Sequence, residues 1–166
     1  MDLNSLWQGL EGSALGIYIA ESTWAFPTLE SVHVMAFVTV LGTLLVVDLR
    51  LLGIGWKDTK LTTLSEEALK ITWIAFGLAA TTGLLLFVSK ATSYVINPYF
   101  QLKLIMMALA GLNMVVFQFI TWKSVEEWNT GAVPLAAKVS ATLSLLLWIA
   151  VVFFGRAIGF TLSMFY

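Results

Sequence analysis

The sequence predicts an all-α integral membrane protein, a four-helix bundle with an N-terminal amphipathic interfacial helix. Of the 166 residues, 59% are hydrophobic and only 11% are charged, whereas soluble domains usually carry about 25% charged residues. The mean hydropathy is +0.89. Four apolar stretches each supply the roughly 20 residues that cross a hydrocarbon core. The length suits a single membrane domain over residues 1–166.

The N-terminal stretch, about residues 2–20, reads as an amphipathic helix that rests in the membrane interface or against the bundle. A loosely ordered arm is the alternative. No basic segment precedes an apolar stretch here, so no signal peptide is expected. The apolar residues at helical spacing are Leu3, Leu6, Trp7, Leu10, Ala14, Ile17 and Tyr18.

The four membrane spans are expected at about residues 28–52, 64–91, 98–122 and 135–160. Pro27 and Pro98 mark the starts of the first and third spans, because proline is favoured in a first helical turn. A longer third span that ends at Trp128 is the alternative.

Basic residues orient these spans. Six fall on the side of the first and third connections, and they are Arg50, Lys57, Lys60, Lys70, Lys123 and Lys138. The opposite side holds Lys90, Lys103 and Arg156. The positive-inside rule therefore predicts that both chain termini lie outside. Aromatic belts are expected from Trp24, Tyr94 and Tyr99 at the outer interface and from Trp56, Trp122 and Trp128 at the inner one.

Several classes of function are excluded by composition. The chain has no cysteine, so disulfides, iron–sulfur clusters, thiolate metal sites and cysteine nucleophiles are absent. A net charge of −1 offers no basic field for nucleic acid. No Ser-His-Asp arrangement, HExxH motif or phosphate-binding loop is legible. Whether the protein is an enzyme stays undetermined, with electron transfer as one option.

Three ionisable residues from different spans are expected at similar depth. At 1.5 Å per residue, His33 lies about 9 Å past Pro27 and Lys103 about 7.5 Å past Pro98. Arg156 lies about 33 Å along a span that starts at the inner side. All three then lie near the outer leaflet, where ionisable groups are costly and usually functional. In the alternative reading, Lys103 and Arg156 snorkel to the interface and His33 only packs between helices.

This trio favours a haem b site. His33, the single histidine, is the candidate metal ligand, because a neutral imidazole is a common axial ligand of haem iron. Ala36 and Phe37 are expected to line the haem slot, and Lys103 and Arg156 to pair with its propionates. The sixth ligand stays open, with Met106 and Met107 as candidates. A copper or zinc site is less favoured, because soft thiolate ligands are missing.

The leading hypothesis is therefore a membrane-embedded b-type haem-binding protein, for electron transfer, redox sensing or haem handling. The alternatives are a non-enzymatic oligomeric membrane subunit and a small transporter or channel. A small bundle with stripes of small residues predicts a homo-oligomer in the lipid bilayer, a dimer or trimer. Its redox partner is not specified. Asp48, at the end of the first span, is expected to pair with a basic residue of the loops and to fix the helix end.

Part of the chain also resembles a known family. The run Pro27-Thr28-Leu29-Glu30-Ser31-Val32-His33, then Gly42 and Asp48-Leu49-Arg50-Leu51-Leu52-Gly53, resembles the first span of a family of small bacterial inner-membrane proteins of unknown function. Asn97-Pro98-Tyr99-Phe100-Gln101-Leu102-Lys103 and Gly155-Arg156 resemble later motifs of that family.

The resemblance extends from about Trp24 onward and implies a multi-pass protein of the bacterial inner membrane, with both ends periplasmic once the basic residues orient it. It singles out His33, Lys103 and Arg156 but brings no activity. The chain is also loosely similar in plan to membrane cytochromes of the b561 type. Those cytochromes have several histidines and this chain has one, so two-haem electron transfer across the membrane is not implied.

Overall fold

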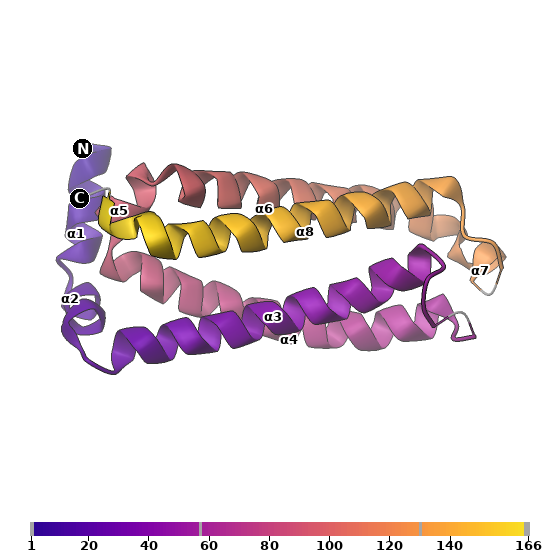
Figure 1. Ribbon diagram of the computed structural model, residues 1–166, viewed down its shortest axis with the longest axis horizontal. Helices are drawn as coiled ribbons and strands as arrows, with labels where there is room; N and C mark the ends of the chain where they lie inside the picture. Colours follow the sequence, from indigo (N-terminus) through magenta and orange to yellow (C-terminus); the bar gives the residue numbers. More distant parts are fainter. Residues whose placement is uncertain (1, 57, 130, 165–166) are drawn as a thin grey trace.

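The computed structural model describes residues 2–56, 58–129 and 131–164, without the side chain of Ser163. Within these ranges the chain is helical and has no strand, which confirms the predicted all-α class. Four long helices run side by side as a bundle (Figure 1), and they are α3 (Ala25–Leu51), α4 (Leu61–Ser89), α6 (Pro98–Val116) and α8 (Leu135–Thr161). Lys57, used above to orient the spans, lies outside the described residues.

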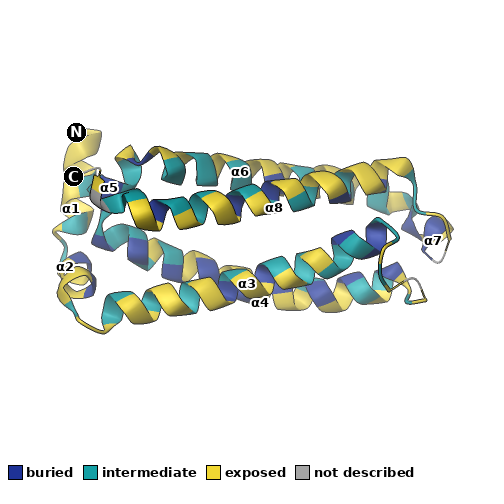
Figure 2. Ribbon diagram, in the orientation of Figure 1, coloured by how far each residue is buried: buried dark blue, intermediate teal, exposed yellow. Residues whose placement is uncertain are grey.

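Each long helix has the length and the apolar composition needed to cross a membrane, the third counted over Pro98–Trp128. Each of them carries large apolar side chains that are exposed on the outside of the bundle (Figure 2). This arrangement suits hydrocarbon as the surrounding solvent. In α6, Ala110 is the single buried residue.

Two short helices stand where one was expected at the N-terminus. They are α1 (Leu3–Glu11) and α2 (Ala14–Glu21), and both cross the end of the bundle where the two chain termini lie (Figure 1). We call this the terminal end. The break falls at Gly12, because the Ser13 hydroxyl accepts the N–H of Gly16 at 3.1 Å and caps a new helix.

A corner helix, α5 (Ala91–Ile96), separates the second and third spans. Glu11 ties α1 to this corner by accepting hydrogen bonds from the backbone N–H of Thr92, at 3.1 Å, and from its hydroxyl. Asn97 then caps α6 by accepting the N–H groups of Tyr99 and Phe100. The Asn97 side chain also donates to the Thr161 hydroxyl of α8 at 3.0 Å.

The opposite end of the bundle, which we call the loop end, has its own small core. After α6 the chain passes through a π-helical turn (Phe117–Thr121) and a 3₁₀ turn (Trp122–Ser124) into α7 (Val125–Trp128). The core residues there are Leu51, Leu61, Val125, Trp128, Ala137 and Ala141. Trp128 is therefore packed inside the protein rather than placed in an interfacial belt, and its Nε1 donates to Ser124.

The bundle is built from two helical hairpins. The α3 and α4 helices pack against each other along their length, as do α6 and α8. The two hairpins meet mainly through α3 and α8 (Figure 1). Side chains at this junction are therefore the ones that depend on both halves of the chain.

Candidate functional site

The imidazole of His33 is half-buried and faces α4. Its Nδ1 lies 2.9 Å from the carbonyl oxygen of Ala79 and 3.2 Å from the Thr82 hydroxyl oxygen. A carbonyl only accepts, so Nδ1 carries the hydrogen. Thr82 donates its own hydrogen to the Leu78 carbonyl at 2.7 Å, which leaves its oxygen free to accept as well. The lone pair of the neutral ring is therefore on Nε2, which makes no hydrogen bond with any described residue.

A glycine lets this ring approach α4. A Cβ atom built on Gly83 would lie 3.0 Å from Cε1 of His33 and 3.4 Å from its Nδ1. Any larger residue would press the ring away from its two acceptors. Gly83 and the acceptors on the preceding turn thus form a cradle that fixes how the imidazole is oriented.

Aromatic and cationic groups from the other spans complete the site. Phe37 stacks on His33 with ring centroids 6.5 Å apart, and Trp148 of α8 lies 6.0 Å from Phe37. Lys103 of α6 places its Nζ 5.8 Å from the centre of the Phe37 ring. The lysine passes close to Gly155, where an added Cβ would lie 3.7 Å from Nζ. All four long helices therefore contribute to one site near the terminal end.

The other residues singled out from the sequence make no hydrogen bond or ring contact with His33. Arg156 is exposed, with its guanidinium 5.0 Å from the centre of the Phe160 ring on its own helix. Met107 is half-buried one turn beyond Lys103 on α6. Ala36 is buried and lines a groove of about 320 Å³ on the α3–α4 hairpin.

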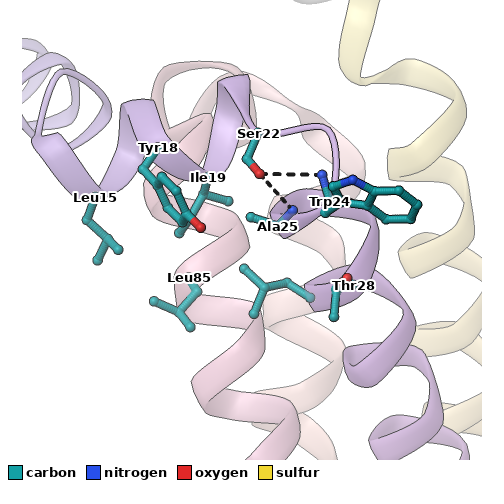
Figure 3. A pocket seen from close by; sticks show the side chains of 9 residues that line it. Leu15, Tyr18, Ile19, Ser22, Trp24, Ala25, Thr28 and Leu85 are labelled. Atoms are coloured by element: carbon teal, nitrogen blue, oxygen red, sulfur yellow. Dashed lines mark hydrogen bonds between the residues drawn. The ribbon is translucent and has the colours of Figure 1, made fainter.

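A second groove, of about 380 Å³, lies under α2 at the terminal end (Figure 3). The Ser22 hydroxyl holds its rim by accepting the N–H groups of Trp24 and Ala25. The remaining lining is mostly apolar and consists of Leu15, Tyr18, Ile19, Thr28, Leu29 and Leu85. His33 lines neither groove.

Asp48 is the residue whose setting differs most from expectation. It is only 6% exposed, and its Oδ2 atom has no hydrogen-bond partner. The expected pairing with a basic loop residue does not occur within the described parts of the chain. Arg50 holds the loops instead, by donating to the carbonyl oxygens of Thr59 and Asn129 at 3.2 and 3.4 Å. The sequence feature that indicates this burial is the position of Asp48, an isolated carboxylate directly after the apolar pair Val46-Val47.

Over the described ranges, no group of three or more histidine and acidic side chains comes together to hold a metal ion. The ligand that His33 offers to a metal is thus a single nitrogen.

The fold and this site define a class, a four-helix membrane protein whose single histidine is oriented by a backbone carbonyl. Comparison with family models gives the family. Residues 7–161 match the model of a family of unknown function, DUF6644, and the chain belongs to that family. No curated protein and no solved structure matches the chain.

Proposed function

We propose that this protein binds haem b in the membrane, with Nε2 of His33 as the nitrogen that would hold the iron. The observation that carries the proposal is the hydrogen bond from Nδ1 to the Ala79 carbonyl at 2.9 Å. Histidines that ligate metals commonly donate their other ring N–H to a carbonyl or carboxylate, which fixes the tautomer and raises the basicity of the ligating nitrogen. The Ala79 carbonyl accepts from Nδ1 of His33 in this way.

The neighbours of His33 fit such a group in part. Phe37 and Trp148 provide aromatic surface, and Lys103 provides a cation for a propionate between the hairpins. Arg156 faces away, so we assign one internal cation rather than two. His33 lines neither groove, so a haem held by His33 would lie outside both of them. Met107 of α6 is the candidate sixth ligand within the chain.

Bound haem would supply one-electron chemistry, which makes electron transfer or redox sensing the role we propose. His33 would hold the iron, and the Lys103 ammonium would compensate the negative charge of a propionate away from water. We place the protein in the bacterial inner membrane with both termini outside. A homo-oligomer is part of the proposal, because a second chain would cover a haem that one small bundle only partly encloses.

The test is the visible spectrum of protein made in cells supplied with haem precursors and purified in mild detergent. We expect a Soret band that His33→Ala abolishes while the helical content is kept. Lys103→Ala should lower haem affinity about tenfold, which corresponds to the loss of roughly 1.5 kcal/mol for a charge-assisted hydrogen bond. Lys123→Ala is the matched control, because Lys123 is exposed at the loop end.

Two outcomes would count against the proposal in different ways. Protein that is colourless as purified and after haem addition would end it. A Soret band that survives His33→Ala would keep the cofactor but refute the ligand.

A further inference from the structure

Asp48 lies at the junction of the two hairpins, away from the His33 site. It projects from α3 with its Oδ2 atom buried and without a hydrogen-bond partner, and Ser144 of α8 is the hydroxyl group within reach of its carboxyl group. Phe37 and Trp148 make another α3–α8 contact nearer the terminal end. The surroundings of Asp48 therefore depend on how closely α3 and α8 pack.

No described cation compensates this carboxyl group. On its own helix, Arg50 is engaged by the carbonyl groups of the loops. The charged residues on the facing stretches of α4 and α8, in the 3₁₀ turn after α6 and in α7 are all exposed, and they are Glu66, Glu67, Lys70, Lys123, Glu126, Glu127 and Lys138. A second buried atom at this end of the hairpin, Oγ of Ser65, also has no partner.

The physical consequence concerns the charge of Asp48. An ionised carboxylate removed from water costs several kcal/mol unless a cation or several hydrogen bonds compensate it. Here the compensation is one hydroxyl group. The neutral carboxylic acid avoids most of this cost. Its O–H group is a hydrogen-bond donor, and the Ser144 hydroxyl oxygen is able to accept from it. A bound metal cation would need more oxygen ligands than this arrangement offers.

We propose that Asp48 is a proton-binding site, occupied while the two hairpins are packed together and emptied when the α3–α8 contact opens to water. In the step, the O–H bond of the carboxylic acid breaks, the proton passes to a water molecule, and carboxylate and hydronium result. Proton release and hairpin opening then favour each other. The proposal is independent of haem binding.

Infrared spectroscopy of the full-length protein in lipid tests the occupancy. At neutral pH we expect a carbonyl-stretching band of a protonated carboxylic acid that shifts in heavy water and disappears in Asp48→Asn. Glu30→Gln is the matched control, because Glu30 is an exposed carboxylate on the same helix. It should leave the band unchanged. A wild-type protein without the band, or a band that persists in Asp48→Asn, overturns the proposal.

A second variant keeps the test decisive if Asp48→Asn does not fold. Ser144→Ala should shift the frequency of the band without removing it, since it deletes the hydrogen-bond partner and keeps the acid. An unshifted band in Ser144→Ala counts against the site. A protonated-acid band that is seen only after sodium and potassium are removed also overturns it, because the occupant would then be a metal cation.

Discussion

At the scale of single residues, the two ring nitrogens of His33 have different surroundings. Nδ1 is saturated by a carbonyl and a hydroxyl oxygen from α4, while Nε2 has neither. Nε2 is not one of the buried atoms that lack a partner, so its lone pair is accessible at the surface of the ring. The asymmetry is what makes the ring suitable as a ligand.

We predict that the His33 imidazole keeps its position against α4 only when residue 83 is glycine. In Gly83→Ala the new methyl group would meet His33 at 3.0 Å, so the ring should shift and its Nδ1 proton signal should change in NMR spectra. Gly77→Ala on the same helix is the control, because nothing lies within 4 Å of that position. The control should gain about 0.5–1 kcal/mol in thermal unfolding, and Gly83→Ala should not. An equal gain in both variants would refute this prediction.

We predict that the phenol of Tyr94 ionises at a higher pH than an ordinary tyrosine. It lies in the corner helix α5, outside the spans, where burial raises its pKa from 10.0 to about 12 and the Glu30 carboxylate adds to the shift. The folded state favours the neutral phenol. The contribution of Tyr94 to the free energy of unfolding is therefore fully present below pH 10, and it is lost as the pH rises toward 12. An alkaline absorbance titration should show one late tyrosinate, absent in Tyr94→Phe. A wild-type titration in which all tyrosines ionise near pH 10 would contradict it.

The sequence predicts the site only in part, because counting residues along a helix gives depth and not direction. His33 and Lys103 both face the bundle, since each packs against a glycine, Gly83 and Gly155. Arg156 follows Gly155 directly and points outward over Phe160. The environment of Asp48 was not predictable, because it depends on Ser144, almost a hundred residues away.

At the scale of helices, each end is fixed by a specific polar contact where the sequence allows one. The long apolar runs predicted four spans, and α8 begins at residue 135 as expected. The corner helix α5 was missed, because Lys90 interrupts the run with φ −149° and ψ 44°, a local conformation that composition does not encode. The π-helical turn after α6 also leaves no mark on hydropathy.

Asn97 is predicted to hold the corner between the second and third spans. It is fully buried, caps α6 and bonds to Thr161 of α8. Asn97→Ala should lower the free energy of unfolding by about 1–2 kcal/mol, as expected for a lost N-cap. Asn97→Ser, which retains a capping oxygen, should lose less. Denaturant titration in detergent micelles measures both, and equal losses would show that capping is not the reason.

At the scale of the whole molecule, both chain termini lie at one end of the bundle (Figure 1). Most of the described basic residues belong to the helix ends and turns of the loop end. The positive-inside rule predicts from this separation that the loop end faces the cytoplasm.

The orientation itself is testable, because the chain has no cysteine. Asn4→Cys and Asp58→Cys each place one thiol at an exposed position, the first at the terminal end and the second at the loop end. With a membrane-impermeant maleimide, intact cells should label the first variant, and the second should react only after permeabilisation. The reverse pattern would invert the topology.

The division into two hairpins also bears on how the protein is synthesised. The α3–α4 hairpin makes most of its contacts within itself, so it can enter the bilayer and pair while the ribosome is still translating the second half. The α6–α8 hairpin then brings Lys103 toward Phe37 and Ser144 to Asp48. Both polar sites are thus completed only at the last step of assembly, after the translocon has released the final helix.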